Sequence, residues 1–410
     1  MTAPDTLTFD ELRNAVKTAA AFRCRRRLQP AGGEGDKVFP PTFAGAVYAI
    51  EKRRVPGREG AAQCVLLDSV QSQANRMEQA LQEALDAGKL VVPHVVVDFS
   101  EYDPNDGDAN DPEKLIDAVG KITSLQVPHR LADAILRDSE HNGEPFRDSD
   151  KGKALNRVCL ANATPLFELC PTALIFGMWD STGPKGGLGP KFERAIVSEV
   201  VGIGAEWHDD YRARGVRRDP LEIRAAVKVV KNADKSWHIA GVNEKGATEP
   251  SKINHSSVPF ESKNSGVTIE YAEQTTTLSL IVLRRLHFPV NGKTSPGVDI
   301  AARTVLAALG LAGATLAFES GMGLRSRCLL WPDGPMTWEL LDKPGQAPKK
   351  FAISSDQAVE ILNQAIKNAK NANLPWPTDP VVLKPSSELV ELVRRSQLEA
   401  TKEEADSGGK

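Results

Sequence analysis

A long apolar stretch, Asp299 to Phe318, constrains the fold most. Read as a helix, it carries apolar side chains on nearly every side, so it must be covered all round. It follows the strongest strand signal in the chain, Thr275 to Phe288, which is rich in alternating β-forming residues. A second alternating segment, Leu324 to Trp331, comes after it. This order predicts a buried helix packed against a sheet.

The same order of elements occurs earlier in the chain. A short strand at Cys64 to Leu67 precedes an amphipathic helix at about 69–87 and a strand at Val95 to Phe99. The apolar run Pro171 to Trp179 is interpreted as a further buried strand. Because strands and helices mix without strict alternation, the sequence predicts an α+β fold. A repeated strand-helix-strand order is compatible with a split β-α-β core of the ferredoxin-like or RRM-like kind.

The predicted domain organisation is one α+β domain, here called the palm, with insertions and a C-terminal part. The polar stretch at 232–265 has scattered Gly, Pro, Asn and Ser and is typical of an inserted loop or hairpin. The expected divisions are a palm at 1–335 with insertions at about 100–160 and 232–265, a helical appendage at 336–400, and a disordered tail at 401–410.

Composition excludes several classes of protein. Among 410 residues, 51 Lys and Arg stand against 54 Asp and Glu, a net charge of −3, so bulk basicity cannot drive nucleic-acid binding. The five cysteines contain no Cys-x-x-Cys pair of a zinc or redox site, and their odd number argues against a disulfide framework. No signal peptide or membrane span of about 20 apolar residues is expected. We therefore expect a cytoplasmic protein with no membrane partner.

Catalytic motifs fail when their spacing is tested. The glycine-rich turn at 183–191 has no Walker pattern, and the acidic loop at 103–108 lacks calcium ligands at the required positions. No two of the seven histidines have the spacing of a metal-binding helix. The sequence thus predicts no enzyme, no metal and no cofactor.

Basic residues beside glycine-rich backbone are the signals that remain. Bare glycine backbone allows close approach of a phosphate chain, and nearby cations then bind it. For each cluster, the alternative is a solvated charged strand or turn. The clusters are Lys185, Lys191 and Arg194 around one turn, Arg325 and Arg327 after Gly321-Met322-Gly323, and Arg23, Arg25 and Arg27 on one face of a strand.

Four ordered motifs together resemble one family. They are Gly35 to Thr42, Asp68 to Glu78, Pro128 to Ile135 and Phe176 to Gly187. The family is the RAMP-superfamily backbone subunit of type I-U (also called I-G) CRISPR effector complexes. The resemblance covers about residues 20–332.

This resemblance implies an RRM-like palm that polymerises along a CRISPR guide RNA and leaves its bases free to pair with target DNA. The implied partners are the guide RNA, the target DNA strand through the guide, other copies of the chain and other effector subunits. A reader of the RNA backbone needs cations and amides at only a few places, which suits the composition.

Combining both arguments gives the remaining RNA-binding candidates. Gln71, Gln73, Asn75 and Arg76 are expected off the apolar stripe near the start of the 69–87 helix, where a helix dipole favours phosphate. The alternative is a polar solvent face. His129 and Arg130 follow Pro128 at a helix start, where anion contact and simple N-terminal polarity are both open.

Two rival functions are kept. One is a metal-dependent target-RNA endonuclease of the related type III backbone kind, with Asp180 as the candidate aspartate, although a single carboxylate is a poor magnesium site. The other is an α+β scaffold that binds no nucleic acid.

Overall fold

The structure is a computed structural model that describes residues 4–44, 47–106, 114–206, 221, 227–232, 236–241, 244–253, 255 and 266–407. The chain divides into two compact units. The first comprises Met1–Phe99, Gly120–Glu206 and Gly266–Ser386, and the second comprises Ser100–Val119, Trp207–Ser265 and Ser387–Lys410.

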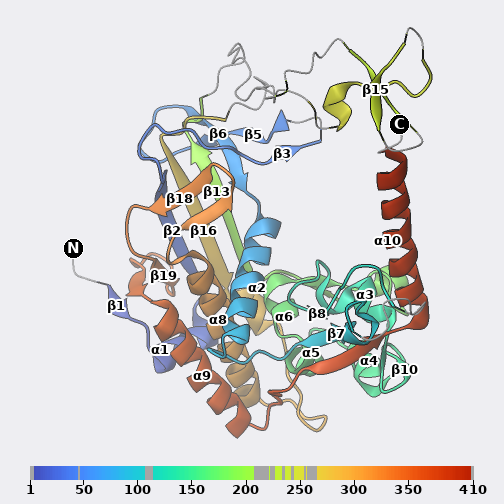
Figure 1. Cartoon of the computed structure of the whole chain (residues 1–410). Coiled ribbons are helices and arrows are strands. Elements are labelled where there is room, and N and C mark those ends of the chain that lie inside the picture. The colour runs from blue at the N-terminus through green and yellow to red at the C-terminus, as the bar shows by residue number, and fades with distance from the viewer. Residues whose placement is uncertain are drawn as a thin grey trace. The chain divides into compact units, whose positions relative to one another are not determined.

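The first unit is built on a large sheet (Figure 1). Ten strands pair in it among the described residues, in the order β1-β20-β19-β2-β16-β13-β6-β5, with β18 also pairing along β2 and β17 pairing with β18. The strands are β1 (Asp5–Thr6), β2 (Ala21–Pro30), β5 (Ile50–Arg54), β6 (Ala61–Asp68), β13 (Ile196–Ile203), β16 (Tyr271–Ser279), β17 (Met322–Arg325), β18 (Cys328–Pro332), β19 (Thr337–Leu341) and β20 (Lys349–Ala352).

Helices cover one face of this sheet (Figure 1). They are α1 (Phe9–Thr18), α2 (Val70–Asp86), α8 (Pro296–Phe318) and α9 (Ser355–Asn371). The apolar helix α8 packs against the other three. It is long and apolar enough to cross a membrane by composition alone, but 78% of its apolar window is buried inside the unit. Burial on all sides is what the sequence predicted for this segment.

The α+β class predicted from the sequence is confirmed. Strands β16 and β18 are both antiparallel to β2, which lies between them, so β16, α8 and β18 form a split β-α-β unit. The earlier strand-helix-strand segment behaves differently. Its last strand, β7 (Val95–Asp98), leaves the large sheet and pairs elsewhere.

Strand β7 belongs to a second sheet of the first unit. Its strand order is β10-β9-β21-β7-β8. The other strands are β8 (Lys121–Thr123), β9 (Ser139–His141), β10 (Glu144–Pro145) and β21 (Val381–Pro385). Short helices precede and follow its strands β9 and β10 in the sequence, namely η2 (Arg130–Ala132), α3 (Ala134–Arg137), α4 (Asp150–Leu155), α5 (Thr164–Leu169) and α6 (Thr172–Phe176).

Several predicted strands have other structures. The run Pro171 to Trp179 forms the buried helix α6 and the short strand β11 (Met178–Trp179), because a short apolar run reads the same in a buried helix and a buried strand. Leu324 to Trp331 is a hairpin and not one strand, since Arg327 at its turn has φ 56°. The strand from Thr275 ends at Ser279 and continues as α7 (Leu280–Arg284).

The segment expected as a C-terminal appendage is largely built into the first unit. Strands β19 and β20 extend the large sheet, α9 packs on α8, and β21 pairs in parallel with β7. Only Ser387 onward belongs to the second unit. There α10 (Ser387–Ser407) is helical where a disordered tail was expected from residue 401, and residues 408–410 lie outside the described residues.

The second unit also contains part of the predicted insertion at 232–265, and the rest of that insertion lies outside the described residues. Its strands β14 (Val229–Lys231) and β15 (Trp237–Ile239) form an antiparallel pair, followed by η4 (Pro250–Ile253). In the same unit, η1 (Ser100–Tyr102) begins the segment that contacts α10, where Gln397 accepts a hydrogen bond from the backbone N–H of Ile116.

Candidate nucleic-acid interface

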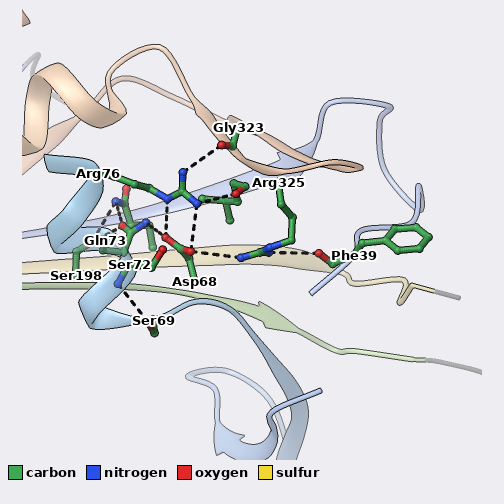
Figure 2. A network of polar contacts seen from close by, with 11 residues as sticks. Phe39, Asp68, Ser69, Ser72, Gln73, Arg76, Ser198, Gly323 and Arg325 are labelled. Atoms are coloured by element: carbon green, nitrogen blue, oxygen red, sulfur yellow. Dashed lines mark hydrogen bonds and ion pairs between the residues drawn. The ribbon is translucent and has the colours of Figure 1, made fainter. Parts of the chain in front are cut away.

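The buried carboxylate of Asp68 organises a polar centre where β6 runs into α2 (Figure 2). Asp68 is only 1% exposed. Its Oδ2 accepts hydrogen bonds from Gln73 Nε2 at 2.6 Å and from Arg76 Nε at 2.9 Å. Arg325 Nη2 approaches Oδ1 at 3.4 Å. A buried carboxylate needs such donors, because an unpaired charge in the interior is costly.

The two arginines tie the β17–β18 hairpin to α2 (Figure 2). Arg76 donates to the carbonyl oxygens of Gly323 and Leu324, at 3.2 and 2.7 Å. Arg325 donates to the Phe39 carbonyl oxygen at 3.3 Å. The motifs at 35–42 and 68–78 therefore meet the Gly321–Gly323 segment at Asp68, although they are far apart in the chain.

Arg327 lies at the turn of this hairpin and is exposed. Its guanidinium carbon stacks over the Phe39 ring, 4.4 Å from the centroid, and its carbonyl oxygen accepts the Phe39 N–H. No carboxylate pairs with it among the described residues. Arg327 is thus held in place by an aromatic ring while its charge stays available.

A second buried centre lies further along α2, at Glu78. Arg130 forms a bidentate ion pair with it, at 2.7 and 2.6 Å, and donates to the Gly177 carbonyl oxygen at 2.9 Å. The motifs that begin at Pro128 and Phe176 are therefore joined to α2 at one guanidinium. Burial raises the pKa of Glu78 to about 7, against the lowering effect of Arg130.

This raised pKa predicts a pH dependence of folding stability. Because the folded pKa lies above the unfolded value near 4.5, folding takes up a proton between those limits. The contribution of Glu78 protonation to the free energy of unfolding is complete below pH 4.5. It is lost as pH rises through about 7, which lowers that free energy by roughly 3 kcal/mol. Urea denaturation across this range should show the fall in wild type. Glu78→Gln should remove this fall in stability, whereas the exposed control Glu83→Gln should keep it. If the stability of Glu78→Gln falls with pH as steeply as that of wild type, the assignment to Glu78 is wrong.

The glycine-rich segment forms a hairpin in which β11 pairs with β12 (Lys191–Phe192). Gly177, before β11, has φ 84°, and a Cβ there would lie 3.1 Å from the Phe192 carbonyl oxygen. A Cβ on Gly189 would lie 1.8 Å from the Asp180 carbonyl oxygen, so no side chain fits at that position. The loop from Asp180 to Pro190 closes with a backbone hydrogen bond of 3.0 Å between these two residues.

Asp180 anchors this hairpin and is 1% exposed. Its Oδ2 accepts a 2.9 Å hydrogen bond from Arg147 Nη1, which also contacts Asn156 Oδ1 at 3.2 Å. The carboxylate proposed as a magnesium ligand in the rival function is therefore engaged in a buried ion pair. Within the residues that the structure describes, no three His, Cys, Asp or Glu side chains are placed to hold a metal ion.

The cations of this hairpin are exposed. Lys191 Nζ lies 5.2 Å from the centroid of the Trp179 ring, which is itself 52% exposed. Lys185 in the loop and Arg194 after β12 are also exposed, and in the described part of the chain none of these three cations pairs with a carboxylate. Two buried ion pairs, those of Arg130 and Arg147, thus anchor the hairpin that presents three available cations.

Strand β2 shows the predicted alternation. Arg23, Arg25 and Arg27 share the face opposite the helices, while Arg26 points inward and donates to the Phe318 carbonyl oxygen at 2.8 Å. Two of the three have acidic partners at 2.7 Å, Arg23 with Glu339 and Arg25 with Glu273. Arg27 stacks over the Tyr271 ring, 4.2 Å from its centroid.

Two of the predicted RNA-binding residues are placed differently from expectation. Gln73 lies on the buried side of α2, because its amide bridges Asp68, Ser198 and Gln274 beneath the helix. Arg130 is buried at Glu78, and its φ of 52° belongs to a tight turn. The predicted residues found on the surface in this region are Gln71, Asn75 and His129.

Sequence reasoning missed the residues that organise these centres. Asp68, Glu78, Arg147 and Phe39 were not among the predicted site residues, and Asp180 was considered only as a catalytic candidate. An acidic residue next to a helix start, as Asp68 is, was the one local signal available. The other residues owe their roles to contacts between distant chain segments.

These features define a class: an α+β protein without overall basicity that presents exposed cations on a glycine-rich hairpin. Residues 22–207, somewhat less than half of the chain, match the family model of the CRISPR-associated protein GSU0053 (Cas_GSU0053). The matched segment contains nearly all of β2, the carboxylates Asp68 and Glu78 and the glycine-rich hairpin. This match to a CRISPR-associated family bears out the resemblance drawn from the motifs and supports a subunit of a CRISPR effector. A search of curated proteins gave no match.

Proposed function

We propose that this protein is a non-catalytic backbone subunit that binds guide RNA and polymerises along it in a type I CRISPR effector complex. Its further partners in this proposal are target DNA paired to the guide, other copies of the chain and other effector subunits, in the cytoplasm. One observation carries the proposal: Lys185, Lys191 and Arg194 are exposed on a hairpin that two buried ion pairs hold in place.

This arrangement suits recognition of a nucleic-acid backbone. Phosphate contacts position a strand without reading its sequence, so a few fixed cations are sufficient. A guide must also leave its bases free for pairing, which favours contacts to its backbone. A chain with net charge −3 can meet these needs when a few available cations lie together on one hairpin.

Co-expression with a guide RNA tests the proposal. The purified protein should retain RNA, seen as raised nucleic-acid absorbance relative to protein absorbance. Light scattering after size exclusion should give masses that rise in whole-subunit steps as the RNA lengthens. A monomer free of RNA at low salt would reject the backbone role and favour the scaffold alternative.

The endonuclease alternative receives less support, because its candidate aspartate is already bound to Arg147 inside the protein. Incubating the assembled complex with complementary RNA and Mg²⁺ tests it. Regularly spaced cleavage that disappears in Asp180→Asn, with RNA content unchanged, would overturn the non-catalytic proposal.

A further inference from the structure

The face of the large sheet opposite the helices carries a set of side chains that the guide site does not use. Directly opposite residues on antiparallel strands point to the same face, and side chains alternate along each strand. Trp331 on β18 lies opposite Gln29 on β2, so it shares the face of Arg23, Arg25 and Arg27. We call this surface the outer face.

Trp331 forms an open aromatic platform on the outer face. Its side chain is 61% exposed, and Leu329, two residues earlier, is 56% exposed. The neighbouring strand β17 has Gly323 opposite Leu329, and a Cβ on the preceding Gly321 would lie 3.4 Å from the Trp331 ring. Glycines beside the indole therefore leave the ring uncovered by side chains of that strand. A large exposed aromatic side chain is a common binding element for nucleobases.

A cationic hollow lies on the outer face along β2. It has a volume of about 400 Å³ and is open to solvent. Its charged side chains are the cations Arg23, Arg25, Arg27 and Lys350 and the carboxylates Glu273 and Glu339, so positive charge is in excess. The surface pairs Arg23–Glu339 and Arg25–Glu273 are each worth little in water, so an incoming phosphate competes with them at small cost.

Arg27 lines the hollow and is also close to the platform along β2. It is two residues from Gln29 on β2, about 7 Å along the strand from the position opposite Trp331. Its guanidinium rests on the Tyr271 ring, and no carboxylate pairs with it among the residues described. An aromatic ring followed by an available guanidinium at this spacing matches a base followed by its phosphate.

We propose that the outer face binds a segment of single-stranded nucleic acid other than the guide, with one base stacked on Trp331 and the adjacent phosphate on Arg27. The following phosphates lie in the hollow of Arg25, Arg23 and Lys350. Carboxylates of Glu273, Glu339, Glu270 and Asp333 lie on or beside these strands, so stacking contributes more than charge. Binding should therefore depend less steeply on salt than guide binding does.

The test uses the full chain loaded with guide RNA and a fluorescein-labelled oligothymidine that does not pair with the guide. Fluorescence anisotropy gives its affinity, and nucleic-acid absorbance gives the guide content of the same samples. Trp331→Ala should weaken oligothymidine binding about tenfold, as expected for one lost base stack, whereas Trp331→Phe should keep most of it. Arg27→Ala should weaken binding and reduce the salt slope by about 0.7. Ile281→Ala, which removes another exposed apolar side chain, should change neither the oligothymidine affinity nor its salt slope.

Other results would overturn the proposal. Wild-type protein that fails to bind oligothymidine, or Trp331→Ala and Arg27→Ala variants that bind it normally, would do so. Loss of guide RNA in these two variants would assign the outer face to the guide instead. A changed subunit mass with unchanged oligothymidine affinity would assign it to a protein partner. The assay repeated on guide-free protein separates these results from failure of the guide-binding function, and an oligouridine arm distinguishes RNA from DNA as the bound strand.

Discussion

Replacing Lys185, Lys191 and Arg194 together by alanine should weaken guide-RNA binding on the order of 100-fold at about 0.15 M salt. The three cations are exposed and lack acidic partners in the described part of the chain, so each is available to a phosphate. Each contact with single-stranded nucleic acid contributes about 0.7 to the salt slope, so the slope should fall by roughly 2 units. Binding titrations at several salt concentrations measure both quantities.

A charge-matched control separates local contacts from net charge. Lys89, Lys367 and Lys370 are exposed in the same unit, and their triple alanine variant changes the net charge equally. It should bind guide RNA nearly as wild type does. Equal losses in the two triple variants would show that overall charge, and not the glycine-rich hairpin, determines affinity.

Asp68→Ala should cause the largest loss of folding stability from a single substitution at the interface. Removing this carboxylate leaves Gln73 without its acceptor and deprives Arg76 and Arg325 of their shared anion. Breaking a buried ion pair in this way costs about 3–5 kcal/mol, and the partial exposure of both arginines places the expected loss near 3 kcal/mol. Chemical denaturation of the full chain measures it.

Asp86→Ala provides the comparison, because Asp86 is an exposed aspartate on the same helix that accepts one hydrogen bond, from Gln82. Its loss should be within about 0.5 kcal/mol. If Asp68→Ala unfolds at the same denaturant concentration as wild type, the Asp68 centre does not stabilise the meeting of α2 with the β17–β18 hairpin.

Local sequence patterns were sufficient for the elements with a clear period. The helix α2 lies where apolar spacing placed it, within a few residues, and β2 is a strand as expected. Side-chain alternation also put Arg23, Arg25 and Arg27 on one face. Periods of 3.6 and 2 residues depend only on neighbouring residues, which is why the chain alone carries them.

Segments that are apolar throughout were less predictable. Pro171 to Trp179 has no polar face, so nothing in its pattern separates a buried helix from a buried strand. The turn at Arg327 follows no glycine or proline signal, and β7 leaves the large sheet although it is as apolar as a central strand. Strand partners are chosen by contacts between distant segments, which a local pattern does not contain.

The sequence by itself determined the α+β class, the amphipathic helix α2, the cationic face of β2 and the motifs that resemble a CRISPR-associated family. Tertiary structure decided which cations remain available. Arg23 is paired with Glu339, 316 residues away, and Arg325 with Asp68, 257 residues away, whereas Lys191 rests on Trp179 and keeps its charge. The physical reason is that an ion pair depends on distance in space, and only the folded chain brings a particular carboxylate to one arginine and leaves the next without a partner.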